Sequence, residues 1–539
     1  MENPQSSADV IVVGAGHNGL VAACYLAQAG LDVLVVERSA TPGGMTCTNP
    51  MAPEAPDHLI NEASIQASLF RTTPIDDELG LSKKYGLRQR LINPAHVQLN
   101  PEGESLAWWR EMDRTVEEIR YFSRRDAARW VELSNTIAAA TAIGLPMMMT
   151  SPTRPEWPNV VKALKSVVKG RKELRNILHW ATISQKEAIE ETFEHDMVRA
   201  PLTCNLPFMH FDSDASGWSL IYLGVYQKWG VAMFEGGTGA FPAALIRCLE
   251  AHGGRVRCSA PVEQFVMAGD RVAGVRLESG EEILARQAVV TGCAPTLALR
   301  KFLPEGVLDH KAQLAVDHIP TSSTSLGNLK INVALSGKLK LTKHQEWRKK
   351  ARHLRGDNVD LRLPCVTWAT HQQSLDAATA CIRGEVPGMI PGLGQVTTAF
   401  DPSMAPEGHD TWWFWSGLVP SKPVEDWDTV QDKIEKTVLS DCAQYYEGLD
   451  TFEIARRTLT PRGLEERFGA PQGNVYHVDP IVTRFGPRRP APGLAGYATP
   501  VPGLFLSGSG THPIAGINGL PGRNAARTMI KTLKQQDRG

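Results

Sequence analysis

The first part of the chain alternates short apolar runs with one helical pattern. Residues 10–13 ("VIVV") are apolar at every position, as in a strand buried on both faces. Apolar side chains recur at helical spacing over 21–29, Gly30 follows, and a second apolar run begins at residue 33. The pattern predicts a strand, a helix and a second strand, which together form a βαβ unit of a parallel sheet.

Glycines fill the turn between the first predicted strand and the helix. Gly14, Gly16 and Gly19 form a G-x-G-x-x-G motif, and Glu37 follows at the roughly 20-residue spacing of an acid that binds a ribose hydroxyl. The first glycine allows the tight turn, the second lets a pyrophosphate approach the backbone, and the third allows close helix–strand packing. The stretch therefore predicts a dinucleotide site, with a glycine-rich turn of another α/β protein as the alternative.

A second glycine pair favours FAD as the dinucleotide. Gly43 and Gly44 follow Glu37 by six and seven residues, and a second bare backbone bend suits a ligand that continues past the ribose. Arg38, beside the acid, could instead contact the 2′-phosphate of NADP. The glycine pair argues against that choice, and the sequence shows no second strand–G-x-G-x-x-G–helix unit for a separate nicotinamide domain.

The same kind of pattern returns in the middle of the chain. Residues 234–295 contain a glycine-rich bend, a helical pattern over 241–253, a strand around 255–258, and three β-segments with turns at 269–270 and 279–280. The run 288–295 ("AVVTGCAP") predicts another buried strand that glycine and proline stop.

The C-terminal stretch predicts a last strand and a last helix. Residues 504–506 are apolar, Gly508 and Gly510 follow, and a helix is expected from about Pro521, a favoured first-turn residue. The positive end of that helix would point at the flavin and stabilise the negative charge of its reduced form by ~0.3–2 kcal/mol. His512 and Asn518 are candidates to face the ring or the substrate; the alternative is that they only tie the bend together.

Bulk composition limits the class of protein. The 539 residues predict two or three domains, and a net charge of −1 gives no general attraction to nucleic acid. The nine cysteines include no C-x-x-C pair, which indicates a reducing compartment and no metal site. The polar N-terminus has no secretory signal pattern, and no run is long enough to span a bilayer. We expect a cytoplasmic protein, either in solution or resting on a membrane surface.

Several motifs resemble the phytoene desaturase-type FAD-dependent oxidoreductases of the carotenoid desaturase and amine oxidase superfamily. They are "GAGHNGLVAA", "ERSATPGG", "YATPVPGLFLSGSGTHP" and "GLPGRNAA". The segments 401–415, 463–477 and 489–500 resemble in particular the branch of pyridine nucleotide-disulfide oxidoreductase domain-containing 2 proteins. The resemblance implies bound FAD and removal of hydride from C–H bonds. Two departures bear on the substrate: Asn49 stands where many relatives have an acid, and Ile514 and Ala515 replace glycines.

The resemblance also implies the architecture. We expect an α/β protein whose Rossmann-type FAD-binding domain is assembled from 1–90, 231–300 and 486–539. An inserted α+β substrate domain of amine oxidase or phytoene desaturase type would comprise 91–230 and 301–485. Val262 would contact adenine through its backbone, with a plain core valine as the alternative. The predicted cofactor contacts are Gly14, Ala15, Gly16, Asn18, Gly19, Glu37, Arg38, Gly43, Gly44, Met45, Val262, Gly508, Ser509, Gly516, Ile517 and Asn518.

The substrate domain offers three further features. Aromatic-rich pieces at 108–109, 217–230 and 411–415 suggest a large apolar pocket, although ordinary core explains any single aromatic as well. Lys330 lies in a strand pattern that resembles a flavin amine oxidase strand whose lysine holds a water beside flavin N5, with a spacing one residue shorter. Residues 156–180 form a basic amphipathic pattern that fits either a membrane surface or a helix packed on a core.

We therefore predict an FAD-dependent dehydrogenase or desaturase that acts on a largely apolar small molecule, with Lys330, His512 and Asn518 as candidate catalytic residues. The electron acceptor would be oxygen or a quinone. A flavin amine oxidase, a flavin-containing interaction or chaperone protein without turnover, and an isomerase that uses reduced flavin are the alternatives.

Overall fold

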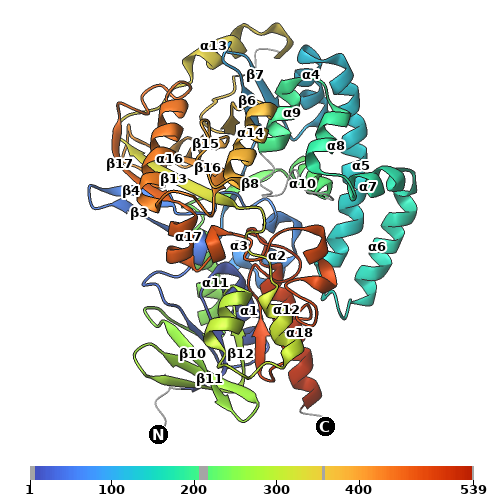
Figure 1. Cartoon of the computed structure of the whole chain (residues 1–539), viewed down its shortest axis with the longest axis vertical. Helices are drawn as coiled ribbons and strands as arrows, with labels where there is room; N and C mark the ends of the chain where they lie inside the picture. Colours follow the sequence, from blue (N-terminus) through green and yellow to red (C-terminus); the bar gives the residue numbers. More distant parts are fainter. Residues whose placement is uncertain (1–6, 205–215, 355–357, 537–539) are drawn as a thin grey trace.

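Two seven-stranded sheets lie toward opposite ends of the chain's long axis, with both termini near the first (Figure 1). The structure is a computed structural model, and it describes residues 7–204, 216–354 and 358–536. Three segments far apart in sequence build the first sheet, because strands from the beginning, middle and end of the chain pair side by side. The architecture is the mixed α/β fold that the sequence predicts.

The first sheet has the strand order β10-β11-β12-β1-β2-β9, with β18 paired to β12. β1 is parallel to both β2 and β12, whereas β11 is antiparallel to both β10 and β12. Its strands are β1 (Ser7–Val13), β2 (Val33–Val36), β9 (Arg255–Arg257), β10 (Val262–Ala268), β11 (Arg271–Leu277), β12 (Glu282–Thr291) and β18 (Leu504–Leu506).

Three helices pack together against this sheet in one buried cluster: α1 (His17–Gln28), α11 (Ala240–Ala251) and α18 (Leu520–Gln536). Small residues set how closely they approach. A Cβ atom on Gly19 would lie 2.2 Å from the carbonyl oxygen of Gly14, and one on Gly522 would lie 2.0 Å from that of Asn18. Both positions therefore require glycine, and both keep α1 tight between the first turn of the chain and its last helix.

The second sheet has the order β17-β13-β16-β15-β14-β6-β7. Every residue of β13 is buried. The apolar face of helix α16 (Trp427–Cys442) belongs to the same hydrophobic cluster as Val333 of β13 and Trp412 of β16. Its strands are β6 (His96–Leu99), β7 (Ser105–Trp108), β13 (Leu326–Leu335), β14 (Cys365–Thr367), β15 (Leu393–Val396), β16 (Asp410–Pro420) and β17 (Glu453–Leu459).

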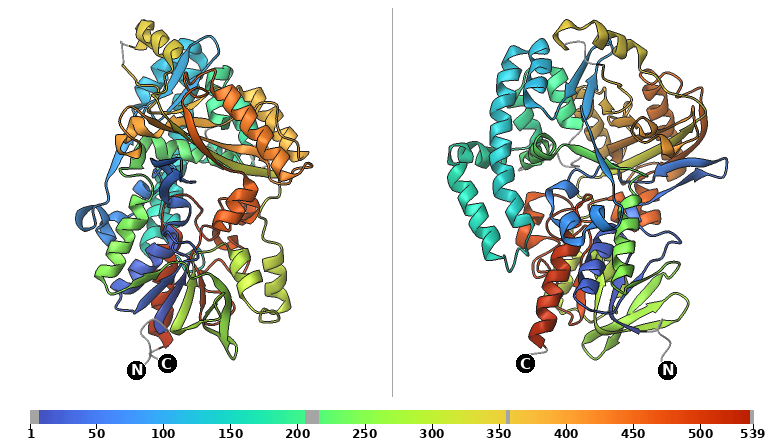
Figure 2. Two further views of the ribbon diagram at one scale, coloured as in Figure 1. Left: turned by 90° about the vertical axis from the view of Figure 1, so that its left-hand side faces the viewer. Right: turned by 180° about the vertical axis from the view of Figure 1, so that it is seen from behind.

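A helical region stands beside the second sheet and reaches down toward the first (Figure 2). Its longest helix is α5 (Arg124–Met148), and the predicted basic stretch 156–180 forms two helices, α6 (Trp157–Lys169) and α7 (Leu174–Trp180), on the outer side of α5 (Figure 1). Over the described part of the chain, no helix combines the length and apolarity that crossing a membrane requires.

Candidate functional site

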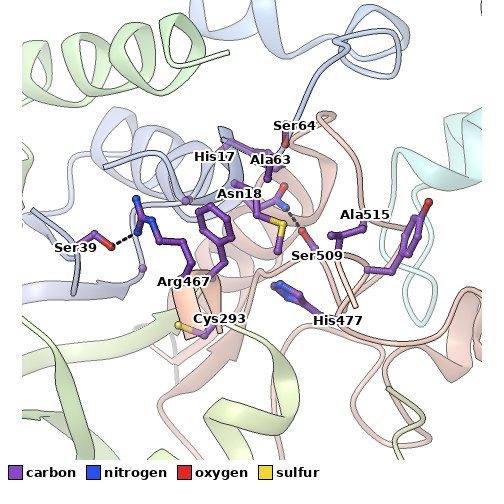
Figure 3. A pocket seen from close by; sticks show the side chains of 18 of the residues that line it. His17, Asn18, Ser39, Ala63, Ser64, Cys293, Arg467, His477, Ser509 and Ala515 are labelled. Carbon is purple, nitrogen blue, oxygen red and sulfur yellow. Dashed lines mark hydrogen bonds between the residues drawn. The ribbon is translucent and has the colours of Figure 1, made fainter. Parts of the chain in front are cut away.

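A cavity of about 360 Å³ extends from the glycine-rich turn of the first sheet to the second sheet (Figure 3). Its walls come from the turn after β1, the end of β2, the segment before β10, and the second sheet through Leu393 and Trp415. Such a volume is typical of a small-molecule or cofactor site. The two terminal segments meet here, since Asn18 Nδ2 donates to Ser509 Oγ at 3.2 Å.

The first glycine turn is shaped for a ligand. Gly14 has φ +96°, which favours glycine, and a Cβ atom on Gly16 would meet no atom within 4 Å. Gly16 lines the cavity, so its bare backbone faces open space that a pyrophosphate can enter. Gly43 donates its N–H to Ala15 O at 2.9 Å, and Gly44 lines the same wall with φ +55°. The two predicted glycine bends therefore form one surface.

Glu37 lies where a ribose-binding acid is expected. Its carboxylate accepts hydrogen bonds from Ala15 N at 2.8 Å and Ser39 N at 2.9 Å, and the residue lines the cavity. A carboxylate has about four acceptor positions, so two bonds to the backbone leave capacity for ribose hydroxyls.

Arg467 is a cavity residue that sequence reasoning missed. It lies on α17 (Pro461–Phe468) and donates to Glu62 Oε2 at 2.9 Å and to Ser39 Oγ at 3.0 Å. Burial alone would raise the pKa of Glu62, but hydrogen bonds from Arg467 and Asn49 lower it. Asn49, the predicted departure from the family, thus supports a buried acid that holds a cation beside the cavity. Only the family motif that contains Arg467 could have indicated it.

Four polar residues mark the far end of the glycine turn: His17, Asn18, Ser509 and His477 (Figure 3). His17 Nε2 donates to Gly516 O at 3.2 Å, and burial lowers the pKa of His17 to about 4. Burial and then Arg489 also lower the pKa of His477 to about 4. Within the described residues, Asn18 Oδ1 and His477 Nδ1 have no hydrogen-bond partner. These atoms can therefore serve a bound molecule.

Most of the predicted cofactor contacts line this cavity, and their role as contacts stays a prediction. The lining ones are Gly14, Gly16, Asn18, Glu37, Arg38, Gly44, Met45, Val262, Ser509, Gly516 and Ile517. Ala15, Gly19, Gly43, Gly508 and Asn518 lie behind this wall and shape it; a Cβ atom on Gly508 would lie 2.3 Å from Cys293 O.

The three candidate catalytic residues lie outside the lining of the cavity. Asn518 donates to the carbonyl oxygens of Ile514, Ala515 and Gly516, which ties the bend together. His512 Nε2 donates to Met147 O at 3.2 Å. Lys330 is fully buried in β13, with Nζ 4.0 Å from the ring centroid of Trp413 and no hydrogen-bond partner within the described residues. Desolvation lowers the pKa of Lys330 well below its ordinary value.

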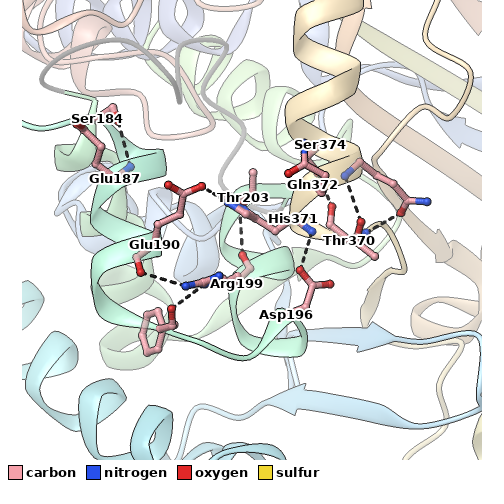
Figure 4. Close-up of polar contacts among 12 residues, drawn as sticks. Ser184, Glu187, Glu190, Asp196, Arg199, Thr203, Thr370, His371, Gln372 and Ser374 are labelled. Atoms are coloured by element: carbon pink, nitrogen blue, oxygen red, sulfur yellow. Dashed lines mark hydrogen bonds and ion pairs between the residues drawn. The ribbon is translucent and has the colours of Figure 1, made fainter.

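A second buried polar cluster lies apart from the cavity (Figure 4). His371 Nε2 contacts Glu190 Oε1 at 3.0 Å, and its Nδ1 contacts Thr203 Oγ1 at 2.8 Å. These residues join α8 (Gln185–Thr192) and α9 (Asp196–Cys204) to α14 (His371–Ile382). The cluster ties the helical region to the second sheet, because α14 packs on β16.

The cavity fits FAD by its own chemistry. One end offers the open backbone at Gly16 and the acid Glu37, and an apolar slot at Val262, Leu297 and Phe302 can take adenine. The cavity then continues past Gly44 toward His17 and Gly516, as a ligand with a further ring system requires. A cavity that reaches both sheets therefore agrees with FAD, the cofactor that the sequence favours over a nicotinamide dinucleotide.

Known proteins match the chain along its length. Residues 12–77 match the NAD(P)-binding Rossmann-like domain, and 165–384 match the flavin containing amine oxidoreductase family. Pyridine nucleotide-disulfide oxidoreductase domain-containing protein 2 of Rattus norvegicus is 28% identical, over 98% of this chain and 94% of the relative. A limonene dehydrogenase chain of Castellaniella defragrans is 24% identical over 97% and 95%, and phytoene desaturase (lycopene-forming) of Pantoea ananas is 22% identical over 97% and 99%.

The fold is shared with solved structures. An oxidoreductase from Methanosarcina mazei superposes with a TM-score of 0.59 at 13% identity, over 97% of this chain and 99% of the other. The flavin family match and the cavity together identify the cofactor as FAD. The chain is an FAD-dependent oxidoreductase, and it is similar to the amine oxidase and phytoene desaturase superfamily, as its motifs predict.

Proposed function

We propose that this oxidoreductase removes a hydride from one C–H bond of a largely apolar small molecule, while the neighbouring carbon loses a proton to solvent, and so leaves a C=C bond. The observation that carries the proposal is the lack of carboxylate, lysine and arginine side chains, among the described lining residues, at the end of the cavity that faces the second sheet. The apolar and aromatic side chains there are Tyr226, Leu393, Trp415, Val475, Tyr476 and Ala515, and the polar ones include His96 and Gln66.

The carboxylates of the cavity lie at its other end. Among the described lining residues they are Glu37 and Glu278, which follow strands β2 and β11 of the first sheet. An amine substrate bound as its ammonium would meet no counter-ion from these residues beside Trp415 or Tyr476, and a buried unpaired charge is costly. This arrangement favours an apolar substrate over an amine.

The histidines of the site do not change that balance. Because the pKa values of His17 and His477 are lowered to about 4, both side chains are uncharged near neutral pH. They can donate or accept a hydrogen bond without bringing charge into the cavity. Their part in the reaction is to orient a bound molecule and keep its surroundings dry.

The names of two relatives agree with this substrate class. The limonene dehydrogenase chain and phytoene desaturase are named for the dehydrogenation of limonene and the desaturation of phytoene. FAD, when bound, supplies the hydride acceptor. The residues of this chain would hold the substrate against it: Trp415 and Tyr476 by apolar contact, and Asn18 and His477 through their unpaired polar atoms. The electrons would then pass to oxygen or a quinone.

The proposal is tested by mixing the yellow holoenzyme anaerobically with alicyclic hydrocarbons, polyenes and alkylamines, while flavin absorbance is followed. We expect bleaching with members of the first two groups and none with amines. Ala515→Asp should slow bleaching at least tenfold, since it places a carboxylate in the apolar wall, and Ala515→Asn is the uncharged control. Bleaching by amines alone would contradict the proposal and assign an amine oxidase.

A further inference from the structure

The outer face of helix α6 carries an exposed apolar stripe. Trp157, Leu164 and Val168 are 71%, 56% and 64% exposed, and with the half-buried Val161 they occupy positions i, i+4, i+7 and i+11 of one helix face. Leu178 of α7 is also 66% exposed. Single exposed apolar residues are ordinary, but a continuous stripe of large ones marks an interaction surface.

The opposite face of α6 packs on α5 and so holds the α6–α7 hairpin (residues 157–180) in place. Ala163 is buried toward α5, and a Cβ atom on Gly170 would lie 3.2 Å from Ala139 Cβ of α5. Thr136 of α5 donates to Glu173 Oε2 at 2.6 Å. The inner face of α6 is therefore already packed on α5. The exposed apolar stripe is a second apolar face of the same helix, and it has no partner among the described residues.

The charges of this hairpin have one sign on the outside. Residues 157–178 contain six basic side chains and one acid, Glu173, which is turned inward to Thr136. Lys162, Lys165 and Lys169 are exposed, each one residue beyond Val161, Leu164 and Val168, so a lysine stripe runs alongside the apolar one. The remaining three basic residues, Arg171, Lys172 and Arg175, continue the stripe through the turn into α7.

We propose that the α6–α7 hairpin docks on the surface of an anionic phospholipid bilayer. Adjacent apolar and lysine stripes are what an interfacial helix needs, because the apolar side chains enter the headgroup boundary while the lysines meet anionic lipid. A symmetric contact with a second copy of this chain would instead bring the six basic side chains of each copy together, which like-charge repulsion opposes.

The docked hairpin would adjoin the catalytic cavity through α5. The carbonyl of Met147, at the end of α5, accepts from His512, and that of Met148 accepts from Asn524 Nδ2 at 3.1 Å. Ala515 and Gly516, which line the cavity, belong to the same C-terminal segment. The surface would therefore place the apolar end of the cavity close to the phase in which apolar molecules dissolve. The docking inference itself depends only on the hairpin.

Flotation of the FAD-loaded full chain with vesicles tests the proposal. We expect binding to phosphatidylcholine–phosphatidylglycerol vesicles, weak binding to pure phosphatidylcholine, and loss of binding at high salt. Lys162→Gln/Lys165→Gln/Lys169→Gln should lower the partition coefficient about a hundredfold. Leu164→Gln/Val168→Gln should lower it at least tenfold. Lys349→Gln/Lys350→Gln/Lys436→Gln, with equal charge change at exposed sites elsewhere, is the matched control.

Unchanged flavin absorbance of each variant shows that the fold survives. Three results would overturn the proposal: equal binding by wild type and the hairpin variants, equal loss in the control variant, or no binding of the wild type to either vesicle. If the hairpin variants instead change the sedimentation of the lipid-free protein, the stripe is a protein–protein contact and the bilayer assignment is wrong.

Discussion

Arg489 donates a hydrogen bond to the carbonyl oxygen of Tyr476, at 3.0 Å from Nη2 to oxygen. The same guanidinium donates to the carbonyls of Val478, Ser509 and Thr511. It is fully buried, and burial lowers the pKa of Arg489 to about 10. One side chain thus fixes two loops that carry Tyr476, His477 and Ser509 into the cavity.

Replacing Arg489 should loosen both loops at once. Arg489→Met leaves several buried carbonyls without donors, each of which costs about 1–3 kcal/mol. We expect the free energy of unfolding to fall by about 3 kcal/mol or more and FAD to dissociate more readily. Urea denaturation followed by flavin fluorescence measures both, and Arg488→Met, at an exposed neighbour, is the control. Equal urea midpoints for the two variants would show that the hydrogen bonds of Arg489 do not stabilise the fold.

Two glycines of one motif should fail in different ways. Gly16→Ala adds a methyl group where no atom lies within 4 Å, so the apoprotein should keep its stability while FAD affinity falls at least tenfold. Gly19→Ala places Cβ 2.2 Å from Gly14 O and should lower apoprotein stability by about 2–4 kcal/mol. Thermal unfolding without FAD and flavin titration separate the two effects. Tight FAD binding by Gly16→Ala would argue against pyrophosphate at this turn.

The sequence predicts elements whose signal is local. Strand β18 covers the predicted 504–506, and α18 begins beside the predicted Pro521. Both follow from an apolar run, a glycine bend and a helix-start residue within one short stretch. The glycine motif, Glu37 and the second bend near Gly44 can likewise be predicted from the sequence, because each is recognised by its spacing from nearby residues.

Residues that act across the fold could not be found in this way. Arg489 contacts backbone carbonyls of two distant loops, and Arg467 pairs with Glu62, which lies 405 residues earlier in the chain. No local periodicity encodes such partners. The tryptophans of β16 show the same limit: Trp412 and Trp413 are buried in the core, whereas Trp415 lines the cavity, and only strand pairing decides which is which.

Lys330 should cost stability near neutral pH. Its pKa is lowered well below 10.5 by desolvation, so the unfolded chain binds a proton that the folded chain holds less readily, and stability falls as pH drops from 10.5 toward the folded value. Lys330→Met should raise the free energy of unfolding at neutral pH by about 1–3 kcal/mol and remove this slope. Urea midpoints at pH 7 and 10 check it. A midpoint that falls in the variant would show that the amine is paired when the protein is folded. If stability rises while flavin reduction slows, Lys330 serves the reaction at the expense of stability.

Buried histidines should make the protein sensitive to mild acid. The pKa values of His17 and His477 fall from 6.5 to about 4 on folding. Well above pH 6.5 both histidines are unprotonated in the folded protein and in the unfolded chain, so their contribution to stability does not change with pH. Between 6.5 and about 4 the unfolded chain takes up the protons first, and each histidine lowers stability by about 1.4 kcal/mol per pH unit.

Single and double substitutions should show how much each histidine contributes to the slope of stability against pH. His477→Asn suits the left-handed backbone at φ +61° and should remove about one proton from the slope of stability against pH. His17→Asn should remove another, and the double variant both. Urea unfolding at pH 7, 6 and 5 gives the slopes, and at pH 7 the comparison also shows what each substitution costs apart from titration. If the double variant keeps the slope of the wild type, folding does not lower the pKa values of these histidines, and both protonate as readily in the folded protein as in the unfolded chain.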